Sequence, residues 1–313
     1  MFFRYHAAMT IDTDALLDRR RLKRRLYLWR GIALLAVLGA LFAVAAVWDD
    51  GSLAGRDHIA RLNIDGVIGE DRWLDKAVRE VAEDDRAKAL IVRINSPGGS
   101  TFGGEALYTN LRLVAAKKPV VAVIGTLGAS AGYLIALAGD RIYVRETTIT
   151  GSIGVIFQTA EFSKLMEKLG VSAESITSGA LKDEPSMTRP LSPAGRAAIK
   201  GLVDETHAWF VNLVAERRKL PRETVATLAD GRVYSGKAAL DYKLVDALGG
   251  EPEAIRWLEQ NRALPKDLWI HTIKVGPPSR FLDDLGSRLF RKIVLSERLS
   301  LDGLVSVWHA DGQ

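Results

Sequence analysis

The sequence of 313 residues contains no cysteine. This excludes disulfide scaffolds, thiolate zinc sites and cysteine nucleophiles, and it suits an oxidising compartment. Histidine is scarce as well: the five histidines are scattered, with no H-E-x-x-H motif and no close pair, so we expect no metal site. Internal repeats and low-complexity linkers are also missing. The hydrophobic content of 48% is nevertheless that of an ordinary globular protein with a buried core.

The net charge of +5 belongs to the N-terminal arm. Residues 1–30 carry eight Lys or Arg against three Asp, which accounts for the whole excess and leaves the rest of the chain neutral. A basic cluster of this kind binds anionic lipid or nucleic acid, and the segment that follows it decides between the two.

An apolar segment follows the basic arm. Residues 31–47, GIALLAVLGALFAVAAV, contain no charge and would span roughly 26 Å as a helix, which is the short end of what crosses a bilayer core. Trp29 and Trp48 flank it, as interfacial aromatic residues do. We therefore expect a single-pass anchor in the inner or plasma membrane over residues 31–48, in contact with lipid, and no nucleic-acid partner. The positive-inside rule places the arm in the cytoplasm and the body outside it. The A-x-A motif at Ala43–Ala45 leaves a cleaved signal peptide as the alternative.

Beyond residue 58, short apolar runs alternate with amphipathic segments. The strands that we predict are Ile59–Ile68, Ala89–Asn95, Pro119–Gly125 and Arg141–Val144. The predicted helices are Trp73–Glu83, Gly104–Lys117, Ala131–Ala138 and Arg196–Lys219. This alternation indicates an α/β fold of βαβ units with a mostly parallel sheet. In the tail, residues 264–313, apolar residues recur at helical spacing, so we expect an amphipathic helix packed on the body or on a neighbouring subunit. Contact of its basic residues with a membrane is the alternative.

Ser130 lies in GTLGASAGY, between an apolar strand and the start of a helix. The pattern G-x-S-x-G is the nucleophile elbow of α/β-hydrolases, which needs a downstream histidine. By chain order, His207 or His271 could serve with Asp246, although the position of His207 on a long helix favours a packed helix residue. The alternative for Ser130 is a helix N-cap, a position that serine often occupies.

Three further stretches carry candidate residues. Asn95–Gly99 (NSPGG) closes the strand before that of Ser130, and strand ends of neighbouring βαβ units meet at the sheet edge where α/β proteins bind ligands. Ser152 is enclosed by glycines in TGSIGV, at a strand-to-loop junction. Lys182 follows a predicted strand end and Ser178-Gly179 in a polar loop, and a lysine acts as a base only when its pKa is lowered. Taken singly, these glycines are typical of turns and this lysine of a solvated surface.

Taken together, the motifs NSPGG, GASAGY, TGSIGV, SGALKD and GRVYSGKAALDYKLVDALGG resemble the signal peptide peptidase A family of membrane-bound serine peptidases. That family is related in fold to the Clp protease and crotonase superfamily. The resemblance covers residues 58–260, with the motifs in the family's order. The site residues that it implies are Ser130 as nucleophile, Lys182 as general base, Ser152 to orient the lysine, and the backbone N–H groups of Ala131 and of Gly98 or Gly99 as oxyanion hole.

The resemblance also implies hydrolysis of peptide bonds in remnant signal peptides, without metal or organic cofactor. It implies a ring-shaped homo-oligomer of single-domain chains in which neighbouring protomers complete each active site. Two positions depart from the family's pattern: Ala131 and Lys243 stand where the family has glycine. The alternatives are an esterase that uses His207 or His271, and a catalytically inactive membrane scaffold of the same fold.

Overall fold

The structure is a computed structural model that describes residue 23 and residues 25–41, 56–276 and 304–307. The chain separates into two compact units, residues 1–56 and residues 57–313. In the first unit, residues 25–41 are helical and exposed. Within the described ranges, no helix combines the length and the apolar character that a membrane span needs. The predicted anchor, residues 31–48, runs on into residues 42–48, which lie outside the described residues.

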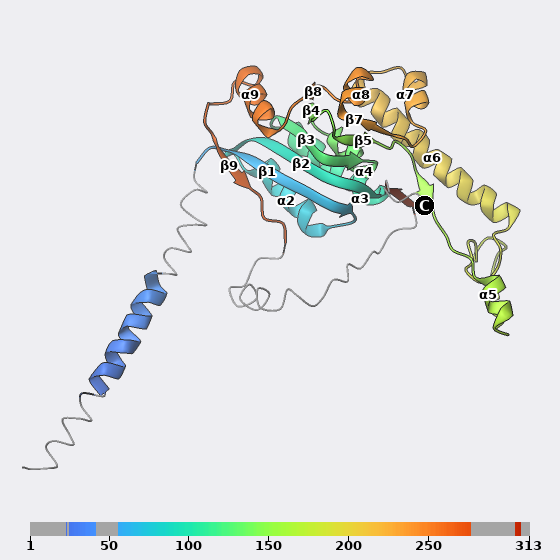
Figure 1. The fold of residues 1–313 in the computed structure, drawn as a ribbon, viewed down its shortest axis with the longest axis horizontal. Helices are drawn as coiled ribbons and strands as arrows, with labels where there is room; N and C mark the ends of the chain where they lie inside the picture. The colour runs from blue at the N-terminus through green and yellow to red at the C-terminus, as the bar shows by residue number, and fades with distance from the viewer. Residues whose placement is uncertain (1–22, 24, 42–55, 277–303, 308–313) are drawn as a thin grey trace, which may run out of the picture. The chain divides into compact units, whose positions relative to one another are not determined.

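A mostly parallel sheet forms the centre of the second unit (Figure 1). Its four central parallel strands are β1 (His58–Ile68), β2 (Ala87–Ser100), β3 (Val120–Ala129) and β4 (Arg141–Val144). The helices that connect them are α2 (Arg72–Glu83), α3 (Thr101–Ala115) and α4 (Ala131–Ala136). Each strand pairs with the next in the chain, as successive βαβ units do. The predicted α/β class and the mostly parallel sheet are therefore confirmed.

Further strands and helices complete this unit. The remaining strands are β5 (Ile149–Gly151), β6 (Ile156–Phe157), β7 (Val233–Ser235), β8 (Ala247–Leu248), β9 (Trp269–Thr272) and β10 (Leu304–Val307). The remaining helices are α5 (Ser163–Lys168), α6 (Pro193–Arg218), α7 (Arg222–Leu228), α8 (Gly236–Asp241) and α9 (Glu251–Asn261). The strand order is β6-β10-β2-β3-β4-β8, while β1 pairs with β2 and β9, and β5 pairs with β3 and β7. The helix predicted in the tail lies outside the described residues.

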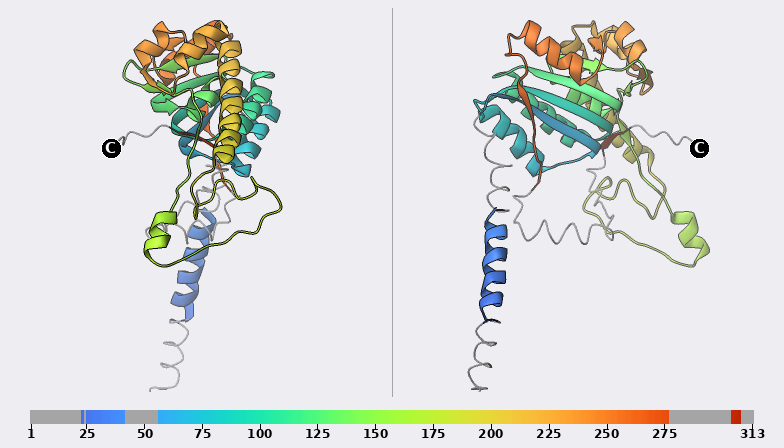
Figure 2. Two further views of the ribbon diagram at one scale, coloured as in Figure 1. Left: turned by 90° about the vertical axis from the view of Figure 1, so that its right-hand side faces the viewer. Right: turned by 60° about the vertical axis from the view of Figure 1, so that its left-hand side comes forward.

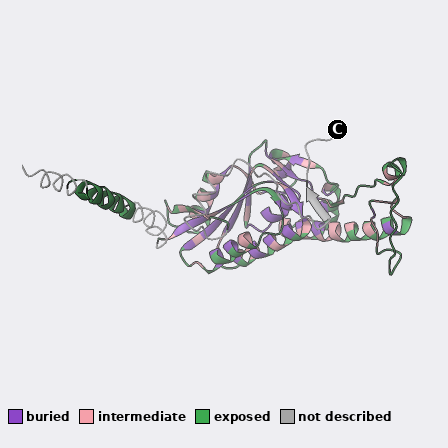
Figure 3. Cartoon of the chain, turned by 90° about the horizontal axis from the view of Figure 1, so that it is seen from below, coloured by how far each residue is buried: buried purple, intermediate pink, exposed green. Residues whose placement is uncertain are grey.

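The core lies on both faces of the sheet, because successive residues of a strand point to opposite sides. In β1, Ala60 and Leu62 join the larger buried cluster, to which α3, α4 and the second half of α6 contribute. Ile59, which precedes Ala60 and points to the opposite face, joins a smaller cluster with residues of α9. Figure 3 shows the buried residues concentrated in the sheet and in the helices that cover it. The segment of residues 158–192, which includes α5 and is here called the loop arm, projects from this body (Figure 2).

The long helix α6 begins at Pro193, three residues before the predicted start. Ser192 is its N-cap, and the Ser192 hydroxyl accepts a hydrogen bond from the Gly195 N–H at 2.9 Å. Proline suits the first helical position because its missing N–H would have had no partner within the helix. The Ser-Pro pair therefore sets the helix start, and apolar periodicity alone places it too late.

Lys243 offers a test of local strain. It has a φ of 60°, the left-handed conformation that favours the glycine of the family's pattern. Its backbone N–H and C=O bond Leu240 and Arg218, contacts that do not need the lysine side chain. We expect Lys243→Gly to raise the free energy of unfolding by about 0.5–1 kcal/mol, measured by urea denaturation. Lys237→Gly in α8 is the matched control and should lower it; equal effects of the two substitutions would contradict the strain argument.

Candidate active site

Ser130 occupies a strained turn between β3 and α4. Its backbone has φ 57° and ψ −119°, a conformation that costs free energy for any residue with a Cβ. Ser130 stands at the N-cap position of α4, and its C=O accepts from the Leu134 N–H at 2.9 Å, but among the described residues its side chain makes no capping hydrogen bond. The residue is 1% exposed, and its N–H donates to the Gly151 C=O at 2.8 Å. Strained, uncapped residues of this kind are typical of functional sites.

The NSPGG motif lies beside this turn, as predicted. Strand β2 continues to Ser100 instead of ending at Asn95, because Gly98 and Gly99 pair with the end of β1. On the other side of β2, Ser96 pairs with Gly128 of β3. The start of α4 packs on the same backbone: a Cβ added at Gly132 would lie 3.0 Å from the Ser96 carbonyl oxygen. The two motifs therefore meet at one edge of the sheet.

The predicted oxyanion donors differ in their surroundings. The Gly98 N–H donates to the Ser96 hydroxyl at 3.1 Å, so it is engaged within its own turn. Gly99 is packed so closely on β1 that an added Cβ would lie 1.8 Å from the Ile68 carbonyl oxygen. Ala131 begins α4 in helical conformation, so this position does not demand the glycine of the family's pattern. Its methyl group lies against α3, 3.1 Å from where a Cβ on Gly104 would be.

Ser152 lies at the end of β5, next to Ser130. Strand β5 pairs in parallel with Leu127–Ala129 of β3, which brings the two strand ends together. Like Ser130, Ser152 has a positive φ, 50°, and it is buried. Its N–H donates to the Arg232 C=O at 2.9 Å. The backbone therefore places these two serines on adjacent turns.

Two tyrosines that sequence reasoning did not single out support these turns. A Cβ at Gly151 would lie 2.6 Å from the Tyr234 ring, and the Tyr234 hydroxyl donates to the Leu228 C=O at 2.8 Å. Tyr133, directly after the Ser130 turn, is fully buried and donates to the Leu244 C=O at 2.8 Å. Burial raises the pKa of Tyr133, which keeps this hydroxyl protonated as a donor. Residues of the motif GRVYSGKAALDYKLVDALGG thus pack against the two serine turns and stabilise them, a role that the sequence alone does not show.

Lys182 lies on the loop arm, apart from these turns. Its side chain is exposed, and its backbone N–H bonds the Gly179 C=O at 3.0 Å. Within the described ranges, the structure gives the Lys182 amine no hydrogen bond to Ser130 or Ser152. The strand end expected before Ser178 is wrong, since residues 171–177 form no regular element. Figures 1 and 2 show the loop arm extending away from the sheet edge that carries α4.

The histidine triad is not assembled. The His207 Nε2 bonds the Ala229 C=O at 2.9 Å, as a helix residue that holds a neighbouring turn. Asp246 pairs with Arg218 at 2.8 Å and accepts from the Ile142 N–H, so it has a structural role. His271 lies on β9, with its ring 5.1 Å from that of Trp269. Among the described residues, no cluster of three or more His, Asp or Glu is arranged to hold a metal ion.

An extended segment lies between β2 and β6 at this edge of the sheet. The backbone of β10 pairs antiparallel with Gly98–Ser100 of β2 and, on its other side, with Ile156–Phe157 of β6. Ser306 stands opposite Gly99 in this register. The site thus includes a slot of two strands that accepts a third strand beside the glycines.

The chain is similar to a family of peptidases and to several known proteins. The family model described as Peptidase family S49 matches residues 112–265. A Synechocystis sp. protein named as a candidate protease is 40% identical over 214 residues, which cover 68% of this chain and 77% of that protein. An Enterococcus faecium protein named as a candidate signal peptide peptidase is 33% identical, over 67% of this chain and 65% of its own. A ClpP1 mutant from Listeria monocytogenes superimposes with a TM-score of 0.39 at 18% identity, over 62% of this chain and 92% of the mutant. The chain belongs to peptidase family S49, the family of signal peptide peptidase A.

Proposed function

We propose that the protein is a membrane-anchored serine endopeptidase with Ser130 as nucleophile and Lys182 as general base. The observation that carries this proposal is the Ser130 turn: a serine with positive φ and no cap bond, beside Ser152 and the glycines of β2. A cap would not need this strained backbone. A nucleophile gains from it, because the turn fixes the hydroxyl at the sheet edge.

The proposed reaction is acyl transfer to water. The neutral Lys182 amine takes the Ser130 proton as the hydroxyl oxygen attacks the scissile carbonyl, and Ser152 orients that amine. The N–H of Ala131, with that of Gly99 or Gly98, stabilises the oxyanion of the tetrahedral intermediate. The amine then protonates the leaving nitrogen, and water hydrolyses the acyl-enzyme. The chemistry requires neither a metal nor an organic cofactor.

The slot between β2 and β6 supports peptide binding. A peptide that adds as a strand to a sheet gains affinity from main-chain hydrogen bonds. Its alternate side chains reach the surfaces on either side of the sheet, and these contacts give specificity. A substrate that takes the place of β10 in this slot would place its backbone beside Gly99, the proposed oxyanion donor. Extended remnants of signal peptides, without folded structure of their own, suit such a slot.

Completion of the site between protomers explains where Lys182 lies. Its exposure on the loop arm leaves the amine free to reach Ser130 of a neighbour in a ring. The loop arm also exposes large apolar side chains, among them Leu169, Ile176 and Met187, with Ile176 97% exposed. Apolar surface of this kind marks an interaction site. We therefore propose a ring-shaped homo-oligomer in which the loop arm packs on the next protomer.

The membrane location is proposed from the N-terminal sequence. The run at residues 31–47 carries no charge and follows the basic arm, which the positive-inside rule assigns to the cytoplasm. The peptidase unit would then face the opposite side, where remnant signal peptides leave the bilayer. Fractionation combined with the mass of the mature chain tests this arrangement, and a chain that starts near Ala46 would contradict the anchor.

A covalent probe tests the proposed nucleophile. An alkyl fluorophosphonate forms a phosphonate ester with an activated serine oxygen and releases fluoride. We expect the full-length protein in detergent to be labelled at Ser130, as located by peptide mass spectrometry, and Ser130→Ala to remain unlabelled. Ser152→Ala is the matched control and should still be labelled at Ser130, more slowly. Labelling at another serine in both the parent and Ser130→Ala would refute the proposal.

A further inference from the structure

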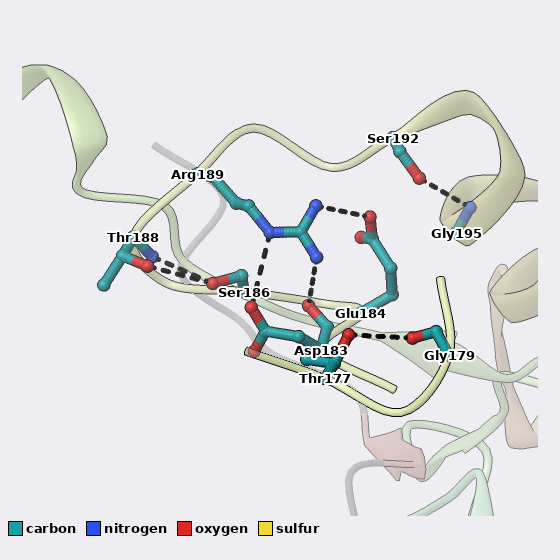
Figure 4. Close-up of polar contacts among 9 residues, drawn as sticks. All are labelled: Thr177, Gly179, Asp183, Glu184, Ser186, Thr188, Arg189, Ser192 and Gly195. Atoms are coloured by element: carbon teal, nitrogen blue, oxygen red, sulfur yellow. Dashed lines mark hydrogen bonds and ion pairs between the residues drawn. The ribbon is translucent and has the colours of Figure 1, made fainter. Parts of the chain in front are cut away.

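Arg189 holds both acidic residues that follow Lys182 in the loop arm (Figure 4). Its Nε donates to the Asp183 carboxylate at 3.3 Å, and its Nη2 donates to the Asp183 backbone C=O at 2.9 Å. Its Nη1 donates to the Glu184 carboxylate at 3.1 Å. One guanidinium thus binds a backbone carbonyl and two carboxylates, and it fixes the chain directly after the proposed base.

Glu184 connects this cluster to α6. Its side chain is only 3% exposed, and a Cβ added at Gly195 would lie 2.6 Å from its Oε2. Within the described part of the chain, that Oε2 atom is buried and has no hydrogen-bond partner. A buried carboxylate is costly unless it is paired, so its contact with Arg189 is the interaction that keeps Glu184 in place. The residues that follow Lys182 therefore pack closely against the first turn of α6.

The charge of the cluster matters for a lysine base. The neutral amine is the active form, and nearby carboxylates favour the protonated form by raising its pKa. Asp183 and Glu184 place two negative charges directly after Lys182 in the chain, and Arg189 offsets one of them. The first turn of α6 carries one charged residue, Arg196, which lines a groove of about 820 Å³ together with Pro190 and Leu191 of the loop arm.

We propose that Arg189 is a positioning residue for Lys182: it fixes the turn that carries the amine and limits the negative charge beside it. The inference rests on the proposed function, because it assigns Arg189 a role only if Lys182 is the base. Arg189 acts through the backbone of Asp183 and through the charges that follow Lys182 in the chain.

A series of variants with different charge tests the inference. Asp183, Glu184 and Arg189 together carry a charge of −1. Arg189→Met makes the charge −2, Asp183→Asn makes it 0, and Arg189→Lys keeps it at −1. The measurement is the pH dependence of kcat for hydrolysis of a fluorogenic peptide by the full-length assembled protein. We expect the apparent pKa to shift upward by about 0.5–1 pH unit in Arg189→Met and downward by a similar amount in Asp183→Asn.

Positioning adds a second readout. Arg189→Met should lower the maximal kcat about 10-fold with little change in KM, and Arg189→Lys should recover the pKa but only part of kcat, since it lacks the planar fork. A purely structural role would lower thermal stability and leave the pH profile unchanged in every variant, and that result overturns the inference. If Arg189→Met does not fold, Asp183→Asn tests the inference alone, by the direction in which the apparent pKa of its kcat profile shifts. Full activity of Lys182→Ala would instead refute the proposed function.

Discussion

Replacing Lys182 with alanine is expected to lower kcat for peptide hydrolysis by about 10³-fold, with KM changed little. The lysine amine is the proposed acceptor of the Ser130 proton, and its removal leaves a neutral hydroxyl as the nucleophile. The substitution should not disturb the fold, because Lys182 is exposed and its backbone bond to Gly179 remains. Activity of the parent should rise towards alkaline pH as the amine loses its proton, and Lys182→Ala should lose this dependence.

The matched control is His207→Ala. This histidine bonds the Ala229 C=O from α6, so its loss should affect stability slightly and leave hydrolysis near the parent's rate. If activity disappeared in His207→Ala and persisted in Lys182→Ala, a histidine triad would be favoured over the proposed dyad. An inactive scaffold would show no hydrolysis in the parent protein.

Mixing variants tests the sharing of sites between protomers. Ser130→Ala and Lys182→Ala are each expected to be inactive alone. When they are unfolded and reassembled together in equal amounts, about a quarter of the sites should combine an intact serine with a neighbour's intact lysine. No recovery in mixed rings would mean that each chain uses its own lysine, and the loop arm would then have to fold back onto its own body.

The sequence predicted the elements whose signals are local. Strand β4 was predicted with its observed bounds, and β1 and α2 to within one residue, because each is a short periodic run with a clear boundary. Strands β2 and β3 were predicted too short. Their glycine-rich ends read as turns, yet they continue to pair, and only the neighbouring strands reveal this. Strand β9 was missed, since its pairing with the start of β1 joins residues over 200 positions apart.

The candidate site was predictable to the same extent. Ser130, Ser152 and the glycines of β2 follow neighbouring strands, so parallel pairing alone brings them together. Lys182 follows no strand of this sheet, and its proposed contact with Ser130 depends on a second chain in the proposed ring. The supports at Tyr133 and Tyr234 depend on contacts from residues about 80 to 110 positions away, which one sequence cannot show. Motif order indicated that these residues matter, whereas the contacts show what they do.

Gly99→Ala is expected to have the second large effect, on both stability and activity. The added Cβ would lie 1.8 Å from the Ile68 carbonyl oxygen and 2.5 Å from its carbonyl carbon. These are backbone atoms of a paired strand, so no side-chain rotation can relieve the clash, and β1 and β2 must separate locally. We expect a loss of about 3 kcal/mol in the free energy of unfolding, at the upper end of overpacking effects. Urea denaturation of the peptidase unit measures it.

Activity should fall beyond what stability explains. Under conditions where Gly99→Ala is fully folded, the displaced β2 end would move a proposed oxyanion donor, and loss of one such donor lowers kcat by about 10²-fold or more. Gly69→Ala is the matched control at the same edge of the sheet: nothing lies within 4 Å of its added Cβ, so both stability and kcat should remain close to those of the parent. A folded Gly99→Ala variant with normal kcat would remove the β2 glycines from the oxyanion hole. The N–H of Ala131 would then have to stabilise the intermediate with a donor from elsewhere.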